Sequence, residues 1–341
     1  MIRKWLKRGN SFIGIVLSGA LILACVHYFL PLPFFPILDA MSIAVPWLIV
    51  ANVLFFVLCL LLRTKRFLLP LLALLIAFVS FGSFYGFTFG DEEIPPQEAF
   101  TLMTYNTRGF NARGYYEPKN AGEQIVAFVE RQQPDIICVQ EFNRTFLTSF
   151  NTYKNRTVIP ATSGLSPQAI FSRFPILDSG VISFPESANS ALFADIVRGK
   201  DTLRVYNVHL QSYQISSRTF LYSNNGLNFL KRLSRVALKH REQAQLVRDH
   251  IENSPYPVIL CGDLNATPFS RPYRILSKGM QDSFKKKGQK WGATYYLNQM
   301  LPYRIDVVLA SPGIEVVKHQ NFDIRASDHL PVEVTLKLQG E

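Results

Sequence analysis

The chain has 341 residues, of which 48% are hydrophobic, with a formal net charge of +11 and four cysteines. The cysteines are too few for a disulfide-built scaffold, so the composition excludes a small cystine-rich protein and we expect four buried free thiols. The charge does not by itself indicate nucleic-acid binding, because residues 1–90 hold seven Lys or Arg and one acid (7 − 1 = +6), over half of the excess.

Three apolar stretches dominate residues 1–90, which we interpret as a membrane anchor. They cover about residues 12–30, 42–62 and 67–87, and none of them contains Lys, Arg, Asp or Glu. About 20 apolar residues in a helix cross the roughly 30 Å of bilayer hydrocarbon. The sequence therefore predicts three transmembrane helices with the lipid bilayer as a partner. A secretory signal peptide would account for the first stretch alone.

The distribution of basic residues predicts the orientation of this anchor. Residues 1–10 contain four bases, the second connection contains three, and the first connection contains none. Cationic loops tend to stay in the cytoplasm. We therefore expect a multi-pass protein of the cell membrane, with a cytoplasmic N-terminus and an extracytoplasmic C-terminal domain. The acidic, proline-containing residues 91–98 are expected to be a linker.

Residues 99–341 show short apolar runs bounded by turn residues, with two amphipathic stretches between them, which predicts one layered α/β domain. Helices are expected at residues 121–132 and 227–252. The second is strongly basic, and it would either contact a phosphate-rich partner or lipid head groups, or present a solvated outer face. Strands are expected at residues 101–106, 135–140, 169–172, 191–197, 203–210, 258–262, 305–310 and 332–338, with a hairpin turn at 198–201.

Oxygen-bearing side chains follow several of these apolar runs. Asn106 and Glu141 come at the ends of two expected strands, and Asp328 precedes the last one. Each alone would more often form a turn than bind a ligand. Together they are hard oxygen donors of the kind that suits magnesium or manganese, whereas zinc would favour nitrogen or sulfur.

Two histidines occur at comparable places in the chain. His209 ends an expected strand, and His329 directly follows Asp328. The pKa of an imidazole permits proton transfer near neutrality, although a lone histidine is more often structural. Asp306 lies inside an apolar run, where it would either serve a site or be buried against Arg304. The ordering of all these residues, more than any one of them, indicates a site that combines metal binding with proton transfer.

The motifs that contain these residues resemble those of a known family. TYN, VQE, NVHL, GDLNATP, RIDVVL and SDHLPVEV occur in this order between residues 101 and 338. The set is similar to the endonuclease/exonuclease/phosphatase superfamily, whose members include deoxyribonuclease I, abasic-site endonucleases, neutral sphingomyelinases and inositol-polyphosphate 5-phosphatases. Gly-Asp-x-Asn together with a terminal Ser-Asp-His is its most specific part. The resemblance implies an α/β four-layer sandwich, in which two packed mixed β-sheets are flanked by helices.

The resemblance also implies a role for each residue. Glu141 would be the principal ligand of Mg²⁺ or Mn²⁺, with Asn106 close to the same ion and Asp328 contributing directly or through water. The catalytic residues would be Asp263, which orients or deprotonates the attacking water; Asn265, which binds the scissile phosphate; and His209 and His329, with His329 held by Asp306.

We therefore expect a membrane-anchored, metal-dependent hydrolase of ester bonds that uses in-line water attack on a phosphodiester or phosphomonoester. The substrate stays open, because nucleic acid, a lipid head group as in sphingomyelinases, and a small phosphoester all fit the family. Nothing in the sequence indicates an obligate protein partner. A non-catalytic binding module is the other reading, but it predicts loss of at least one of these positions, and none is lost.

Overall fold

The computed structural model describes the chain except for residues 1, 31–36, 83–84, 89–98, 112–117, 214–225, 298–300 and 340–341. The expected linker at 91–98 therefore lies outside the described residues. The chain forms two compact units: Met1–Phe84 with Ser223–Leu238 and Ala266–Arg274, and the remainder.

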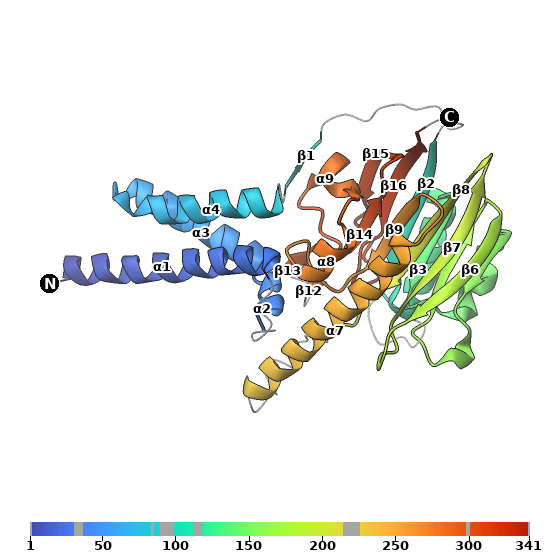
Figure 1. The fold of residues 1–341 in the computed structure, drawn as a ribbon, viewed down its shortest axis with the longest axis horizontal. Coiled ribbons are helices and arrows are strands. Elements are labelled where there is room, and N and C mark those ends of the chain that lie inside the picture. The colour runs from blue at the N-terminus through green and yellow to red at the C-terminus, as the bar shows by residue number, and fades with distance from the viewer. Residues whose placement is uncertain are drawn as a thin grey trace. The chain divides into compact units, whose positions relative to one another are not determined.

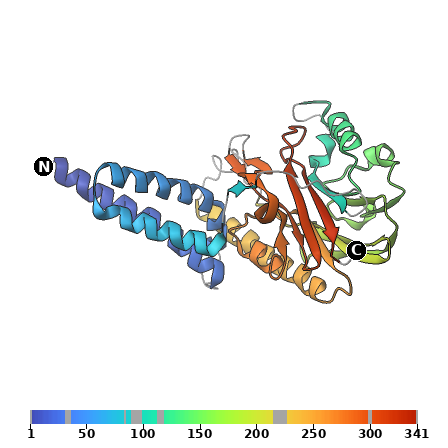
Figure 2. The same ribbon diagram turned by 90° about the horizontal axis from the view of Figure 1, so that it is seen from above.

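The first unit is helical. Its elements are α1 (Ile2–Phe29), α2 (Ile37–Ala40), the 3₁₀ turns η1 (Met41–Ile43) and η2 (Lys65–Phe67), α3 (Val45–Leu61) and α4 (Leu68–Phe81). The long helices α1, α3 and α4 run side by side in both views (Figures 1 and 2). Their shared core includes Leu21, Ile49 and Ala73. Among the described residues, most of the exposed large apolar side chains lie on the outside of these helices, such as Leu54 and Val79.

The prediction of three membrane-spanning helices is wrong on helix length. Among the described residues, only α1 contains a segment long and apolar enough to cross a bilayer, Phe12–Phe29. Helix α3 has 17 residues and α4 has 14. The apolar composition overestimated the lengths of both helices. Residues 42–43 form a 3₁₀ turn before α3, and Gly82, at φ 75°, ends α4. A signal sequence would occupy the same place as α1.

The second unit contains two six-stranded sheets. The first has the order β15-β16-β2-β3-β5-β4 and the second β10-β14-β9-β8-β7-β6. Both are mixed, because β2 runs parallel to β3 and β8 parallel to β9 while the other pairs are antiparallel. The strands are β2 (Ala99–Asn106), β3 (Ile136–Gln140), β4 (Asn155–Val158), β5 (Gln168–Ser172), β6 (Ile176–Ser183), β7 (Ser190–Arg198), β8 (Asp201–His209), β9 (Val258–Asp263), β10 (Gln281–Asp282), β14 (Asp306–Ala310), β15 (Ile314–Asn321) and β16 (Val332–Leu338).

Short ribbons and helices complete this part of the chain. The strand β1 (Gly86–Phe87) pairs with β11 (Gln289–Lys290), and β12 (Tyr295–Leu297) pairs with β13 (Leu301–Tyr303). Its helices are α5 (Ala121–Gln132) and α9 (Ser283–Lys287), with 3₁₀ turns η3 (Arg108–Asn111), η4 (Arg144–Phe150) and η5 (Ala161–Ser163). Two more helices, α7 (Gly226–Glu252) and α8 (Arg271–Leu276), have residues in both units.

Apolar side chains of both sheets meet in one buried core, which includes Leu102, Val205 and Ile259. The outer face of the first sheet packs against α5 through residues such as Ile125 and Ile137. The C-terminal half of α7 contacts the second sheet, where the Tyr206 hydroxyl lies 2.7 Å from Nδ1 of His250. Two packed mixed sheets flanked by helices confirm the predicted sandwich, and all four cysteines are buried free thiols as expected.

A buried amide network joins the two sheets. Asn207 on β8 is fully buried, and its Nδ2 donates to the Val139 and Ala169 carbonyls of the first sheet at 3.0 and 3.1 Å. Gln140 Nε2 donates to Asn207 Oδ1 at 2.6 Å. These bonds satisfy polar groups that water cannot reach, so each lost partner carries a desolvation cost.

We expect Asn207→Leu to lower the free energy of unfolding by about 2–4 kcal/mol, because it leaves buried polar groups unpaired. Denaturant unfolding of the full chain in detergent measures this. Asn155→Ala is the matched control, since the Asn155 amide makes only one long bond at an exposed position, and it should change stability by less than about 0.5 kcal/mol. Equal stability of the two variants would contradict a structural role for the network.

Glu333 on β16 makes the stability depend on pH. Its Oε2 is buried and accepts no hydrogen bond. Burial raises the pKa of Glu333 from 4.5 to about 7, with Lys318 opposing the shift and Asp135 adding to it. The folded state therefore holds this proton more tightly than the unfolded state. Its contribution to stability is complete below pH 4.5 and is lost as the pH rises to about 7.

Glu333→Gln should accordingly raise the free energy of unfolding at pH 8 by about 1–2 kcal/mol and leave it nearly unchanged at pH 4.5. Thermal unfolding at the two pH values measures the difference. Glu130→Gln, at an exposed position of α5, controls for the loss of one surface charge. A gain that is the same at both pH values would show that Glu333 does not titrate as described.

Candidate active site

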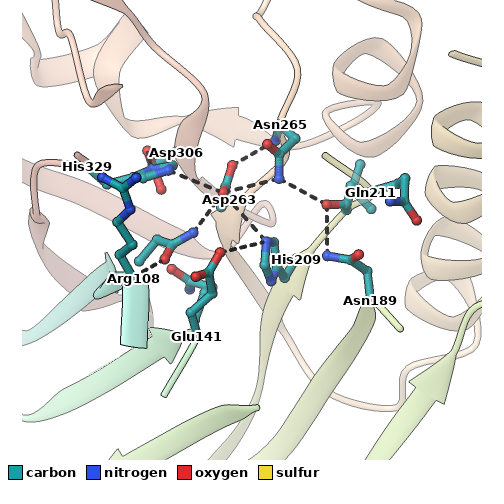
Figure 3. Close-up of polar contacts among 12 residues, drawn as sticks. Arg108, Glu141, Asn189, His209, Gln211, Asp263, Asn265, Asp306 and His329 are labelled. Carbon is teal, nitrogen blue, oxygen red and sulfur yellow. Dashed lines mark hydrogen bonds and ion pairs between the residues drawn. The ribbon is translucent and has the colours of Figure 1, made fainter. Parts of the chain in front are cut away.

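The predicted site residues meet at one edge of the second unit (Figure 3). Asn106 ends β2 and Glu141 follows β3, while His209 ends β8 and Asp263 ends β9. Each of these two strand pairs is parallel, so its carboxyl ends emerge together. The remaining site residues reach the same edge from antiparallel strands: Asp306 starts β14 opposite Asp263, and Asp328 and His329 precede β16.

Asp263 is the centre of this arrangement. Its side chain is almost fully buried, and its Oδ1 accepts the backbone N–H of Asn265 at 2.7 Å. Its Oδ2 accepts the side-chain amides of Asn106 at 3.0 Å and Asn265 at 3.2 Å. Burial raises the pKa of Asp263, although His329 and His209 oppose the shift. The carboxylate is thus fixed by neutral donors and is a better proton acceptor than an ordinary aspartate.

The backbone explains the Gly-Asp-x-Asn spacing. A Cβ on Gly262 would lie 2.1 Å from the Val208 carbonyl oxygen, and its φ is 132°. Asn265 follows at φ 47°, in the left-handed region that asparagine tolerates. These two residues allow the strand to turn sharply, so that Asp263 and Asn265 both point to the same centre.

His329 lies between two carboxylates. Its Nδ1 donates to Asp306 Oδ2 at 2.9 Å, and its Nε2 lies 3.6 Å from Asp263 Oδ2. Burial on its own lowers the pKa of His329, but Asp306, Asp263 and Asp328 together raise it to about 10. The imidazole is therefore protonated at neutral pH, and its Nε2–H can donate. We call Asp263, His329 and Asp306 the Asp–His–Asp cluster.

Two further residues hold this cluster. Thr294 Oγ1 accepts the backbone N–H groups of Ile305 and Asp306, both at 3.0 Å, which fixes the start of β14. The Tyr295 ring lies 4.9 Å from the His329 ring.

His209 differs from His329 in its charge state. Its Nε2 lies 3.7 Å from Asp263 Oδ2 and 4.0 Å from Glu141 Oε1. Burial lowers the pKa of His209, although Asp263 opposes this shift. The site thus holds one cationic and one neutral imidazole around a single carboxylate, so one can donate a proton while the other can accept one.

The oxygen-donor set, which we define as Asn106, Glu141 and Asp328, lies beside the cluster. Burial raises the pKa of Glu141, with His329 opposing the shift, and its side chain remains 42% exposed. Arg108 contacts this set, because its guanidinium lies 3.2 Å from Asp328 Oδ2 and its backbone N–H donates to Asn106 Oδ1 at 3.1 Å. Two partly exposed carboxylates, Glu141 and Asp328, and the buried amide oxygen of Asn106 fit a hard divalent cation.

The Asp–His–Asp cluster is the more compact group of possible ligands, with three buried ligand atoms within 4.8 Å of one another. However, both His329 nitrogens face carboxylates, and a protonated imidazole has no lone pair for a metal. The donor chemistry therefore favours the oxygen-donor set as the place for an ion, with the cluster as the proton-transfer group.

Sequence reasoning did not assign Arg108, Asn189 or Gln211 to the site, and Figure 3 places all three beside it. Asn189 Nδ2 donates to the Leu210 carbonyl at 3.1 Å, and the Gln211 side chain accepts from Ser187 at 2.8 Å. Asn265 Nδ2 donates to the same carbonyl at 3.0 Å. These residues come from loops, where no periodic pattern marks them. The only feature of the sequence that marks Arg108 as a site residue is its position two residues after Asn106.

Comparison with known proteins identifies the family. The model of the "Endonuclease/Exonuclease/phosphatase family" matches residues 103–329, about two thirds of the chain. A model of a domain of unknown function matches residues 4–84. None of the curated proteins matches the chain.

Solved structures of low sequence identity share the fold. An endonuclease/exonuclease/phosphatase from Beutenbergia cavernae is 19% identical, with a TM-score of 0.53, over 71% of this chain and 72% of that one. TDP2 from D. rerio, complexed with a single-strand DNA product, is 15% identical, with a TM-score of 0.54, over 70% and 99%. The human Nocturnin catalytic domain with a bound sulfate is 15% identical, with a TM-score of 0.54, over 73% and 97%. The family model spans every predicted site residue, from Asn106 to His329, so the chain belongs to the endonuclease/exonuclease/phosphatase family and is a hydrolase of ester bonds.

Proposed function

We propose that the protein is a divalent-metal-dependent phosphodiesterase that cleaves nucleic acid by in-line attack of water. The observation that carries this proposal is the convergence of the Asp–His–Asp cluster and the oxygen-donor set at one strand edge. The first can move a proton, and the second can hold a cation next to it.

The chain's own residues divide the chemistry as follows. Asp263 accepts the proton of the attacking water, helped by its raised pKa. His329 donates a hydrogen bond from Nε2 to a phosphate oxygen while Asp306 keeps the imidazole oriented and charged. The neutral amide of Asn265 does not repel phosphate, and its Nδ2 would exchange one of its bonds, to Asp263 or to the Leu210 carbonyl, for one to a phosphate oxygen. Charge that grows on phosphate oxygens in the transition state meets these donors, so they lower the barrier more than they strengthen substrate binding.

We assign Mg²⁺ or Mn²⁺ to the oxygen-donor set, with Glu141 as the principal ligand, Asn106 close to the ion and Asp328 contributing directly or through water. When bound, such an ion stabilises negative charge on phosphate oxygens. His209, neutral and next to Glu141 and Asp263, completes the phosphate-binding surface.

Nucleic acid is the substrate class that the comparisons favour. The D. rerio TDP2 structure contains a single-strand DNA product, and the same fold carries the site residues here. A lipid head group or a small phosphoester would use the same bond chemistry, so substrate identity is decided by direct assay.

We further propose that residues 1–90 anchor the protein in the cell membrane through α1 and that residues 99–341 form the catalytic domain. Support comes from the outward-facing apolar side chains of the helical unit, such as Phe12 at 70% and Val79 at 82% exposure. Water solvates such a surface poorly, whereas lipid does so well. The four bases before residue 10 support a cytoplasmic N-terminus and a catalytic domain outside the cytoplasm.

One assay tests the enzymatic proposal. The full chain in detergent, with Mg²⁺ or Mn²⁺, is offered single-stranded DNA, sphingomyelin and soluble inositol phosphates, with EDTA and His329→Ala as controls. Cleavage of the DNA alone supports the proposal, and cleavage of sphingomyelin alone replaces it with a lipid phosphodiesterase. Hydrolysis of none by a folded chain that binds metal contradicts it.

Topology needs a separate measurement. A reporter that is active only outside the cytoplasm, fused to the C-terminus, should be active in membranes that retain the full chain. Activity of a cytoplasmic reporter at the same position would reverse the proposed orientation.

A further inference from the structure

A cavity of about 500 Å³ lies in the second unit, apart from the Asp–His–Asp cluster. It is lined by the β11–β12 segment on one side and by the end of β15 and the following residues on the other. Three kinds of side chain meet there: aromatic rings, lysine ammonium groups and side-chain amides. None of these lining residues takes part in the proposed chemistry.

Two extended segments, one containing Tyr295 and the other His329, form the wall between this cavity and the active site. Tyr295 pairs with His329 in an isolated bridge and its ring lies against the imidazole. The next residues in each segment, Tyr296 and Leu330, line the cavity. Neighbouring residues of extended chain point to opposite sides. A ligand in the cavity would therefore lie behind the wall that supports His329, within reach of a strand whose phosphate occupies the active site.

The aromatic groups are placed for stacking. The Trp291 side chain is 54% exposed at the cavity, and the Tyr85 ring supports it edge-on at 5.4 Å. Tyr296 lies further along the same lining segment, and the Arg325 guanidinium is 5.2 Å from its ring centroid. Planar rings of this kind bind nucleobases because every base offers a π face.

The polar floor of the cavity is hydrogen-bonded and uncharged. His319 Nδ1 lies 2.9 Å from Ser283 Oγ, and its Nε2 lies 3.1 Å from Asn321 Oδ1. Burial lowers the pKa of His319 to about 4, so the ring is neutral. An acyl chain in the cavity would remove water from the side-chain amides of Gln289 and Gln320 and from the lysine ammonium groups, which is costly.

The charges of the lining are cationic on balance. Lys290 and Lys318 are the two lysines of the lining, Lys318 also interacting electrostatically with Glu333 outside it, and the one lining carboxylate, Asp323, pairs with Arg325 at 3.0 Å. Ammonium groups next to exposed rings fit a ligand that has both an anionic and a planar part.

We propose that this cavity is an accessory binding site for one nucleotide of a single-stranded nucleic acid, with the base stacked on Trp291 and the phosphate held by Lys290 and Lys318. The proposal rests on the proposed function, since it assigns the cavity to the same substrate strand. It predicts that the enzyme binds a strand at two places, the active site and the cavity. A small substrate that has only a scissile phosphate therefore makes the contacts of the active site and none in the cavity.

Binding without turnover tests the site directly. In the His329→Ala background, a fluorescently labelled 12-nucleotide oligothymidine is titrated against the full chain in detergent, followed by anisotropy. Adding Trp291→Ala should weaken binding about tenfold, the loss of one base stack, and adding Lys290→Ala should weaken it and reduce its salt dependence. Phe87→Ala and Lys286→Ala are matched controls, because Phe87 is an exposed aromatic residue and Lys286 an exposed lysine, both outside the cavity lining. Both controls should bind as the parent does.

Catalysis provides a second readout in the otherwise unchanged chain. Trp291→Ala should raise KM for the oligonucleotide about tenfold while leaving kcat/KM for the small diester bis(4-nitrophenyl) phosphate within twofold. Trp291→Phe, which keeps a ring, should recover most of the affinity, and it separates stacking from misfolding. If neither substrate is cleaved, the proposed function fails while the anisotropy result still decides the cavity. Equal binding by the parent and the Trp291→Ala and Lys290→Ala variants overturns the inference, and so does an equal loss in the two controls.

Discussion

His329→Ala should lower kcat for phosphodiester hydrolysis by about 10³-fold or more, within the range expected when a positioned proton donor is lost. The imidazolium is the buried cation between Asp306 and Asp263, and its Nε2 lies 3.6 Å from the Asp263 carboxylate that we propose as the acceptor of the water proton. Without it, developing charge on the phosphate meets two carboxylates with no cation between them. The measurement is kcat at saturating substrate and metal.

Two variants make this result specific. Asp306→Asn keeps the shape but removes the charge that orients the imidazole, and it should cost about 10²-fold in kcat. His250→Ala removes a histidine that bonds Tyr206 on β8, away from the cluster, and should leave kcat within twofold. Thermal unfolding of each variant separates lost chemistry from lost structure. If folded His329→Ala retained more than a tenth of kcat, the Asp–His–Asp cluster would not be the catalytic group.

The strands that deliver the site were predictable from the sequence because they are buried on both faces. β3 and β9 are buried at every residue, so they read as short continuous apolar runs. A polar residue that ends such a run is easily noticed, and Glu141 and Asp263 were found in this way. The helix predicted at 121–132 coincides with α5, where Ile125 and Phe128 share the buried face.

Two long strands escaped prediction for identifiable reasons. In β15 a bulge between Val316 and Lys318 interrupts the alternation, so that Val316 and Val317 are both buried. β6 lies at the edge of its sheet with most of its side chains partly or fully exposed, and its sequence includes Gly180. Neither strand shows the regular period that sequence reasoning depends on.

In the helical unit the elements were found, but they were predicted to be too long. Apolar composition marked the segments correctly, but it could not show where each helix ends. α4 stops at Gly82, and the apolar residues Gly86 and Phe87 form a strand that pairs with β11. Loop residues such as Gln211 stayed hidden because their approach to Asn265 depends on the tertiary fold.

Glu141→Ala should weaken Mn²⁺ or Mg²⁺ binding by about 100-fold, judged by the 10–100-fold that even supporting residues of metal sites contribute. Calorimetric titration of the metal-free chain measures this without reference to activity. Activity should disappear in EDTA, return with added metal, and need a correspondingly higher metal concentration in the variant. Glu186→Ala is a matched control, because Glu186 has the same φ of 50° as Glu141 but an exposed side chain paired only with Lys239 at 3.9 Å. It should bind metal as the unmodified chain does.

The same titration decides between the two groups of acids. If the ion were held by the Asp–His–Asp cluster, Asp306→Asn would abolish metal binding and Glu141→Ala would leave it intact. If the oxygen-donor set holds it, the order is reversed, because Asp306 faces Nδ1 of His329 and not the set. We expect Glu141→Ala to lose metal binding and Asp306→Asn to keep it. An imidazole protonated at both nitrogens repels a cation and offers it no lone pair. The carboxylate of Glu141 is partly exposed, so its oxygens can turn toward a cation.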